Sequence, residues 1–344
     1  MDQLFLIDGF SLLSTSFFGN LPREYFKART QEDKAAALRK ILRTSTGIPT
    51  NGVFVMTKVL TKLMLKYGPS HFAVAWDVSR DTFRRELYPA YKGTRGETPE
   101  ELGVQFGLMQ ELLEAMNIPQ FKWAEFEADD ILGTLSRRFE PQVPVTILTK
   151  DQDALQLVTE RTRVWLHTSK AKDYMGEFGM DEKSYPLPTG FFEFTPETFR
   201  GIYGLDPIQM IDKKALEGDS SDNIPGVYGV GEKAVVPLLR EFGTVERLYE
   251  HIEDLNAAEE KAMKEFMKEL GVSRPPLSYL LKQPEEAGQL VGKEAALLSK
   301  KLATIVTDIP HLDAIELDHL QLAVDREGMM RKFAELEFHN LEAV

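Results

Sequence analysis

Acidic residues follow several short apolar segments of this chain. Asp8 ends the segment at 3–8, and Asp77 directly follows the segment at 71–76. Asp151 and Asp153 lie just after a third segment, at 143–149. If these segments are parallel strands, their carboxyl ends share one edge of a sheet, where ligands bind in open α/β folds. The pattern therefore predicts four carboxylates along one edge of a sheet.

Two further motifs add acidic residues. EADD places Glu127, Asp129 and Asp130 at the start of a predicted helix, and GDSSDN places Asp219 and Asp222 three residues apart. Taken singly, each motif has a structural explanation, because acids cap helices and suit the first helical turn. If the motifs converge, however, pairs ~5 Å apart repel by roughly 3 kcal/mol at an effective dielectric constant near 20. Such a cluster takes up protons or binds cations.

The donor types indicate which cation. The chain has no cysteine, and its six histidines show no metal-ligand spacing. A site made only of oxygen donors favours Mg²⁺ or Mn²⁺. The carboxylates outnumber the positions of one octahedral ion, so we expect two ions. Two divalent ions ~4 Å apart are suited to phosphoryl transfer.

The elements that would position these residues fall into two halves. Up to about residue 195, apolar segments alternate with helical patterns, which predicts an α/β fold with a mainly parallel sheet and flanking helices. Later patterns are helical, so we expect an α/β half at 1–194 and a helical half at 195–344. The expected strands are 3–8, 71–76, 143–149 and 162–167. The expected helices are 50–66, 104–116, 128–139, 195–203, 207–217, 231–242, 244–252, 258–270, 292–306 and 325–336, with loops at 19–48, 84–103 and 168–194.

The charge balance by itself argues against nucleic acid. The 344 residues include 41 Lys and Arg and 54 Asp and Glu, a net charge of −13, whereas DNA-binding surfaces are basic. Five cations nevertheless lie within sixteen residues, either on a solvated loop or on a phosphate-binding strip: Arg80, Arg84, Arg85, Lys92 and Arg95. Lys58 and Lys62 interrupt the most apolar helical stretch, so we expect a cytoplasmic protein without a membrane span.

A glycine-containing turn is predicted between two helices of the second half. In GVYGVGEK, Gly229 and Gly231 allow a tight turn and a close approach to phosphate, and Lys233 adds charge. Either an ordinary interhelical turn or a helix-hairpin-helix DNA-binding turn fits this pattern. It lacks the G-x-G-x-x-G spacing after a strand, so no nucleotide cofactor is expected.

Six motifs together resemble one family. LIDGF, AWDVSRDTFRRELYPAYKGTR, FEADD, LTKDQDALQL, GDSSDNIPGVYGVGEKA and ALLSKKLATIVTDIP occur in this order, as in the bacterial and phage 5′-nucleases. That family comprises the 5′→3′ exonuclease domain of DNA polymerase I and free-standing relatives similar to flap endonucleases. The resemblance covers nearly the whole chain and implies a PIN-like core with a helix-hairpin-helix subdomain. Because the sequence ends soon after 335–341, it resembles the free-standing form. Longer segments near 19–48, 168–194 and 255–287 depart from the family.

The resemblance also implies roles for residues and partners. All nine acids named above would bind two Mg²⁺ or Mn²⁺ ions, and K⁺ is a candidate ligand of the hairpin turn. Arg84 and Lys92 would reach the scissile phosphate, and Tyr91 would stack on a base. Arg80, Arg95 and the hairpin residues would bind DNA, and a mobile arch is expected at about 88–110.

The expected function is cleavage by a monomeric enzyme close to the bacterial nucleoid, in primer removal or DNA repair. The expected substrates are 5′ flaps, nicks and single-strand/duplex junctions, with RNA–DNA hybrids as further candidates. Two alternatives remain at this point: a catalytically silent DNA-junction binder, and a ribonuclease with a related core. The sequence does not separate exonuclease from endonuclease preference.

Overall fold

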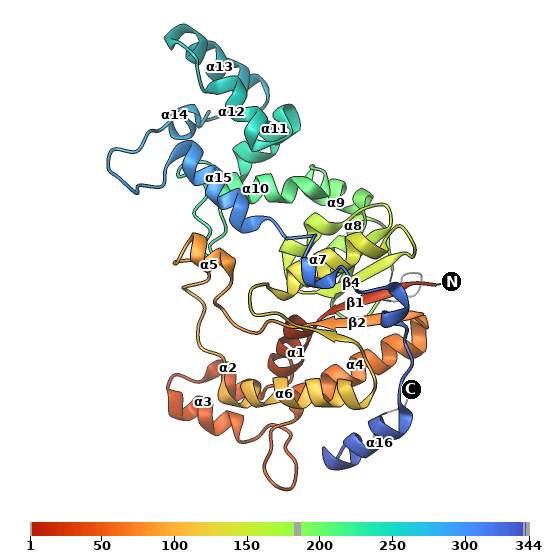
Figure 1. Cartoon of the computed structure of the whole chain (residues 1–344). Coiled ribbons are helices and arrows are strands. Elements are labelled where there is room, and N and C mark those ends of the chain that lie inside the picture. Colours follow the sequence, from red (N-terminus) through yellow and green to blue (C-terminus); the bar gives the residue numbers. More distant parts are fainter. Residues whose placement is uncertain (1, 182–186, 340, 342–344) are drawn as a thin grey trace.

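The computed structural model describes residues 2–181, 187–339 and 341 (Figure 1). The described residues contain a six-stranded sheet in the order β3-β2-β1-β4-β5-β6, parallel except for β6, which pairs antiparallel with β5. The strands are β1 (Leu4–Asp8), β2 (His71–Ala75), β3 (Gln120–Phe121), β4 (Val145–Thr149), β5 (Thr162–His167) and β6 (Phe191–Phe194). The predicted mainly parallel α/β architecture is confirmed, and β1 lies at its centre.

Alternation along β1 creates a core on each face of the sheet. Leu4 and Leu6 face one core, and Phe5 and Ile7 face the other, because successive strand residues point to opposite faces. Helices α1 (Gly9–Phe18), α4 (Asn51–Tyr67), α6 (Glu100–Ala115) and α16 (Arg326–Glu335) cover the Phe5 face. Helix α7 (Ala128–Phe139) covers the other face, together with part of the helical half (Figure 1).

The segments expected as loops contain more structure than their sequence indicates. Residues 19–48 include α2 (Arg23–Lys27) and α3 (Gln31–Leu38), and residues 168–194 include α8 (Ala171–Glu177) and β6; residues 182–186 lie outside the described part. The segment expected to form an arch, at about 88–110, has two parts in the structure. After α5 (Phe83–Leu87), only 88–99 is irregular, because α6 begins at Glu100 and buries Leu102 and Met109 in the core.

The second half is helical, as predicted. Its helices are α9 (Pro196–Tyr203), α10 (Met210–Glu217), α11 (Glu232–Phe242), α12 (Val245–Ile252), α13 (Ala257–Glu269), α14 (Leu277–Leu280) and α15 (Gly292–Ala303). The second half also contains the short 3-10 helices η2 (Pro207–Gln209), η3 (Pro310–Leu312) and η4 (Leu317–Leu320), whereas η1 (Gln152–Leu157) lies in the α/β half. The chain then returns to the α/β half, where α16 packs against α6. None of the helices within the described ranges is long and apolar enough to cross a membrane.

Candidate active site

A cavity of about 1150 Å³ lies at the carboxyl edge of the central strands. Its walls come from the ends of β1, β2 and β4, the start of α7, and the loop that follows α10. Seven of the nine predicted acidic ligands line it: Asp8, Asp77, Glu127, Asp129, Asp151, Asp153 and Asp219. Acidic residues from distant parts of the chain therefore meet in one cavity.

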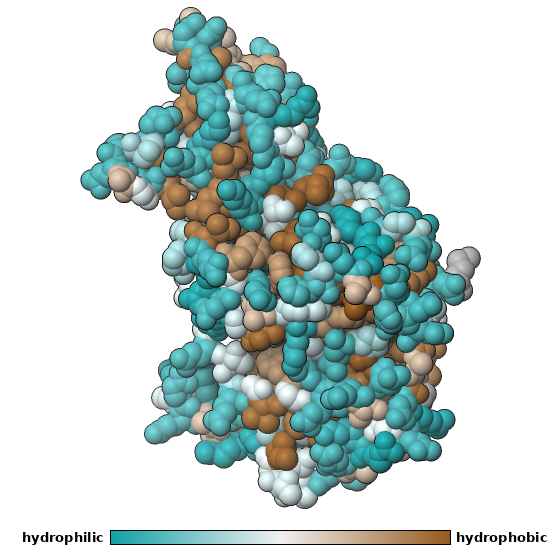
Figure 2. All heavy atoms as spheres, viewed as in Figure 1, coloured by the Kyte–Doolittle hydropathy of each residue, from teal (hydrophilic) through white to brown (hydrophobic). Residues whose placement is uncertain are grey.

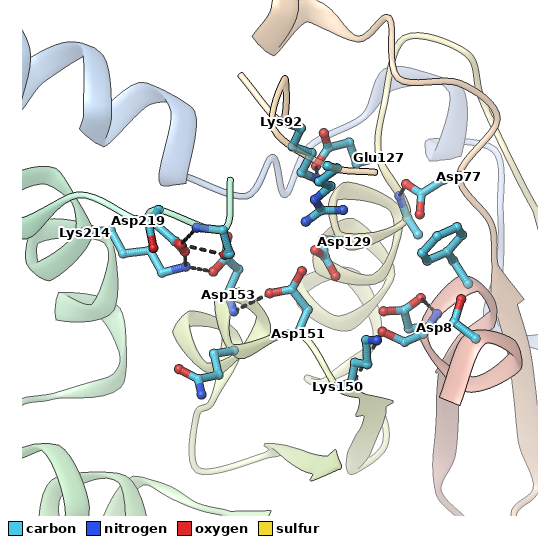
Figure 3. A pocket seen from close by; sticks show the side chains of 18 of the residues that line it. Asp8, Asp77, Lys92, Glu127, Asp129, Lys150, Asp151, Asp153, Lys214 and Asp219 are labelled. Carbon is cyan, nitrogen blue, oxygen red and sulfur yellow. Dashed lines mark hydrogen bonds and ion pairs between the residues drawn. The ribbon is translucent and has the colours of Figure 1, made fainter. Parts of the chain in front are cut away.

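Four of these residues form a set that we call the unpaired carboxylates: Asp8, Asp77, Asp129 and Asp151. None of them forms an ion pair with a lysine, arginine or histidine in the described part of the chain. Figure 3 shows the side chains of Asp8, Asp129 and Asp151 directed toward the same open space. The cavity thus holds negative charge that the protein itself does not neutralise.

Two unpaired carboxylates also cap helices. One oxygen of Asp8 accepts a hydrogen bond from the Ser11 amide at 2.9 Å, and the other accepts from Thr149 Oγ1 at 2.7 Å. Asp151 accepts from the Asp153 amide at 3.0 Å, at the start of η1. The structural explanation of these acids is therefore correct, and it coexists with their position in the cavity.

Burial and mutual repulsion raise the pKa values of three members of this set, Asp8, Asp77 and Asp129. Desolvation raises the pKa of Asp8, and desolvation followed by the negative charges of Asp151 and Asp8 raises the pKa of Asp129. Desolvation by burial, followed by the negative charge of Asp8, raises the pKa of Asp77 to about 6. Asp129 Oδ1 is buried and has no hydrogen-bond partner among the described residues. These groups would be stabilised either by protons or by a cation.

The other acids form a second set, the paired carboxylates: Glu127, Asp130, Asp153, Asp219 and Asp222. Lys92 Nζ lies 2.7 Å from Glu127. Lys214 bridges Asp153 and Asp219, at 2.6 Å from the latter (Figure 3). Sequence analysis missed Lys214, although the KK pair just before ALEGD was a visible signal.

Asp130 belongs to a buried ion pair outside the cavity. Arg84 donates to both of its oxygens at 2.7 Å, and also to the carbonyls of Leu302 and Thr304. Arg84 is 2% exposed and Asp130 0% exposed. The structure thus shows this pair joining α5, α7 and the segment after α15. The metal contact of Asp130 and the phosphate contact of Arg84 stay predictions.

The buried position of Tyr91 likewise differs from the prediction. Tyr91 is 2% exposed, and its hydroxyl lies 3.3 Å from a Glu127 oxygen. A ring in this position offers no face on which a base could stack. The expected stacking contact is therefore not made in this conformation.

We call residues 88–99, which connect α5 to α6, the strap. From this segment Lys92 and Arg95 line the cavity, as does Arg80, which donates to the Gly96 carbonyl at 2.7 Å. Arg95 contacts Asp222 at 2.5 Å, and the Lys92 amide donates to the Asp222 carbonyl at 2.8 Å. Asp222, which is outside the cavity lining, therefore ties the strap to the loop between α10 and α11.

That loop also contains the predicted hairpin turn. Gly229 has φ +82°, and a Cβ there would lie 2.6 Å from the Tyr279 ring. Gly231 precedes α11 and lines the cavity, and Lys233 is exposed in the first turn of α11. The turn thus needs glycine at 229, and its second half opens toward the acidic site.

The oxygen donors of the cavity are of the chemical type that hard divalent cations prefer. It consists of carboxylate oxygens, one of them buried without a partner, and such donors suit Mg²⁺ and Mn²⁺. In the described part of the chain, no three His, Asp or Glu side chains converge closely enough to hold an ion as they stand. Binding therefore requires the carboxylates to turn toward a common ion.

Comparison with known proteins identifies the family. The family model "5'-3' exonuclease, N-terminal resolvase-like domain" matches residues 3–184, and "5'-3' exonuclease, C-terminal SAM fold" matches residues 205–327. The chain belongs to the 5′-3′ exonuclease family. A 5′-3′ exonuclease of Halalkalibacterium halodurans is 35% identical over 322 residues, covering 93% of this chain and 88% of that protein. The resemblance inferred from the six motifs is thus confirmed.

This exonuclease-family chain is also similar to a DNA polymerase and to a solved flap-endonuclease structure. DNA polymerase I of Bacillus caldotenax is 36% identical over 98% of this chain, but the match covers 32% of the polymerase. The chain thus spans about a third of the polymerases that it matches. A structure of the bacteriophage T5 D15 flap endonuclease with DNA and metal ions aligns with a TM-score of 0.55 and 18% identity, over 98% of each chain. At that identity the likeness shows the fold.

Proposed function

We propose that this exonuclease-family protein hydrolyses phosphodiester bonds of DNA in the acidic cavity. The observation that carries the proposal is the set of unpaired carboxylates gathered in one cavity, with Asp129 Oδ1 buried and unpartnered. A stable protein tolerates uncompensated negative charge of this kind where a cation compensates it during function. Acidic oxygen sites beside basic residues suit a phosphate substrate.

We assign the ion-holding role to Asp8, Asp77, Asp129 and Asp151, with two Mg²⁺ or Mn²⁺ ions as the cofactors. Bound divalent ions supply Lewis acidity, which lowers the pKa of an attacking water and neutralises charge on the phosphate. The paired carboxylates retain a supporting role, since Lys214 already neutralises Asp153 and Asp219. This assignment is narrower than the nine ligands expected from sequence.

The cations of the cavity would bind and orient the phosphate. Arg80, Lys92 and Arg95 line the same space as the unpaired carboxylates. Burial alone would lower the pKa of Lys92, but the nearby acidic groups Glu127, Tyr91 and Asp222 together outweigh burial and raise that pKa. The Lys92 ammonium therefore stays charged at neutral pH and can donate to a phosphate oxygen beside the acids.

The α10–α11 turn would bind the duplex part of the substrate. Gly231 and Glu232, at the start of α11, line the cavity, and Lys233 adds an exposed charge. Such a turn suits phosphate without reading sequence, and K⁺ at the turn remains part of the proposal. The proposed substrates are 5′ flaps, nicks and junctions, RNA–DNA hybrids included, cut by a monomer in primer removal or repair.

The test is a cleavage assay with a 5′-flap duplex labelled at each end in turn, with Mg²⁺ or Mn²⁺. We expect products cut near the junction, and calorimetry should detect uptake of divalent ions. Mapping both labels separates exonuclease from endonuclease cleavage. Intact DNA together with no ion uptake would refute the proposal.

One observation favours the silent junction binder as a second candidate. Five of the nine acids carry lysine or arginine partners, and the described carboxylates are not closed around an ion site. A gel assay of the same flap with Mn²⁺ decides, because a binder shifts the DNA without cutting it. An all-RNA flap in the same assay tests the ribonuclease alternative, which requires preference for RNA.

A further inference from the structure

The segment between α1 and α4 has an unusual charge. Residues 19–48, which we call the basic lobe, contain seven Lys and Arg but three Asp and Glu, a net charge of +4 in a chain of net charge −13. The lobe contains α2 and α3, which pack against each other. Its charge opposes that of the rest of the molecule, so its partner is expected to be anionic.

Most of these cations are available to a partner. Arg23, Lys27, Arg29 and Arg39 are exposed and form no ion pair with any residue that the structure describes. Lys40, just after α3, is also exposed, but it lies 3.3 Å from Glu24. In Figure 2, the surface over α2 and α3 is mostly hydrophilic.

An exposed aromatic side chain lies among these charges. Phe26 is 65% exposed, the most exposed phenylalanine on the described surface. The edge of its ring meets Tyr25, with the ring centroids 5.5 Å apart, and Lys34 Nζ lies 5.9 Å from the Tyr25 ring centroid. Exposed aromatic rings on a basic surface are the combination by which proteins bind single strands, because bases stack on the rings while phosphates contact the cations.

The lobe adjoins the acidic cavity. Helix α1 ends with Phe18, which lines the cavity, and the lobe begins at the next residue. At the other end of the lobe, Arg43 lies 3.7 Å from Glu101, in the first turn of α6, directly after the strap. Figure 1 shows α2 and α3 beside the start of α6, while α11 lies toward the opposite end of the molecule.

We propose that the basic lobe binds a single-stranded nucleic-acid arm of the substrate, with Phe26 stacking on a base and the free cations contacting phosphates. The inference rests on the proposed function, because the cavity would then hold the junction between the arm and a duplex at the α10–α11 turn. A duplex is a poorer occupant, since its bases are stacked on one another and offer no face to Phe26. The proposed partner is therefore an unpaired strand that extends across the surface of the lobe.

The first test neutralises three free cations together, as Lys27→Gln, Arg29→Gln and Arg39→Gln. The matched control is Lys58→Gln with Lys62→Gln, two exposed lysines of α4 without ion pairs in the described chain. Fluorescence anisotropy, measured without divalent ions, gives the Kd for two substrates that share one duplex. One substrate has a single-stranded 5′ arm of about 15 nucleotides, and the other has a 5′ arm of about one nucleotide. For the long arm, we expect the Kd to rise roughly tenfold and the salt slope to fall by about 2, at ~0.7 per phosphate contact. The one-nucleotide substrate and the control variant should be unaffected.

The second test isolates stacking. Phe26→Ala should weaken binding of the long arm by about fivefold or more, since each stacked base contributes ~1–3 kcal/mol. Phe26→Trp should restore it, whereas loss of a merely structural contact would not be rescued by a larger ring. Thermal unfolding checks that these exposed substitutions leave the fold intact.

Three results would overturn the inference. The lobe variants could bind the long-arm substrate as tightly as the wild type, they could lose equal affinity for the long-arm and one-nucleotide substrates, or Phe26→Trp could fail to restore the affinity lost in Phe26→Ala. Equal losses would indicate a duplex contact, and unchanged DNA binding would leave an acidic protein as the occupant. The two proposals fail separately. If the wild-type protein binds the arm but does not cleave the flap, only the nuclease proposal is refuted. If the lobe variants cleave the flap and bind the arm as the wild type does, only the proposed role of the basic lobe is refuted.

Discussion

The nine acidic residues predicted as metal ligands divide into two sets in the structure. Asp8, Asp77, Asp129 and Asp151 have no cationic partner among the described residues, whereas each of the other five contacts a lysine or arginine. Both sets come from the same motifs. Asp129 and Asp130 are adjacent in sequence, yet one faces the cavity and the other is locked to Arg84.

The difference shows what each set contributes. A paired carboxylate is compensated within the protein, so it joins segments that are distant in sequence, as Asp130 joins α7 to α5. An unpaired buried carboxylate costs stability, roughly 1–3 kcal/mol for a polar group left without its hydrogen bond. Sites that retain such a cost are commonly functional. The comparison therefore assigns ion binding to one set and support of the site to the other.

The largest expected effect is on cleavage by Asp129→Asn. If the unpaired set holds the ions, losing one charge should slow cleavage of a labelled flap by about 10³-fold or more, because the ions supply several kcal/mol of charge stabilisation. The ion-free protein should become more stable, since the substitution replaces a carboxyl group that is destabilised by burial and by the negative charges of Asp151 and Asp8.

Single-turnover assays and denaturant unfolding measure the two effects. Asp325→Asn, a helix cap of α16 remote from the cavity, is the control for changing one aspartate. Full cleavage by Asp129→Asn would remove the distinction between the two sets.

The neighbouring substitution Asp130→Asn should act on stability instead. It leaves the Arg84 guanidinium buried without its carboxylate, and breaking a buried pair in this way costs about 3–5 kcal/mol. Urea unfolding measures the loss. The double variant Arg84→Met with Asp130→Leu should recover much of it, because neither member of the pair then carries a buried charge. A stable Asp130→Asn protein that takes up no divalent ions would instead make Asp130 a ligand.

Lys214→Met would move two residues from one set to the other. Without the ammonium, Asp153 and Asp219 become unpaired, so the ion-free protein should lose stability, by roughly 2–3 kcal/mol for hydrogen bonds to charged groups left unmade. Divalent ions should then restore part of the loss, since they can replace the missing cation. Thermal unfolding with and without Mg²⁺ measures the difference from wild type. A loss that Mg²⁺ leaves unchanged would show that this pair cannot become an ion site.

Sequence patterns predicted where the acidic cavity lies, but they could not predict which of the acidic residues would have a lysine or arginine partner. The strand-end positions of Asp8, Asp77 and Asp151 follow from period-2 apolar segments and parallel pairing, which are local signals. The pairing of Asp130 with Arg84 joins residues 46 apart, and that of Asp153 with Lys214 joins residues 61 apart. Such contacts depend on how α5 and α10 pack, which no local pattern records.

The same limit explains the missed elements. The two-residue strand β3 and the edge strand β6 are stabilised by the partners beside them rather than by their own pattern. The family resemblance extended the expected arch to about residue 110, but Leu102 and Met109 bury one face of α6. A resemblance between motifs does not show where the helix after them begins to pack against the core.

The smallest expected effect is the proton linkage of Asp77. Its pKa of about 6 is raised above that of an unfolded aspartate, ~3.9, so its stabilising contribution is complete below about pH 4 and is lost as the pH rises through 6. A bound cation must displace the remaining proton, so divalent affinity should fall as the pH falls through 6. Calorimetry at pH 6 in buffers of different ionisation enthalpy should detect release of about half a proton from this group. Asp77→Asn should abolish that fraction, and a wild-type release that the substitution leaves unchanged would place the proton on Asp8 or Asp129, whose pKa values are also raised.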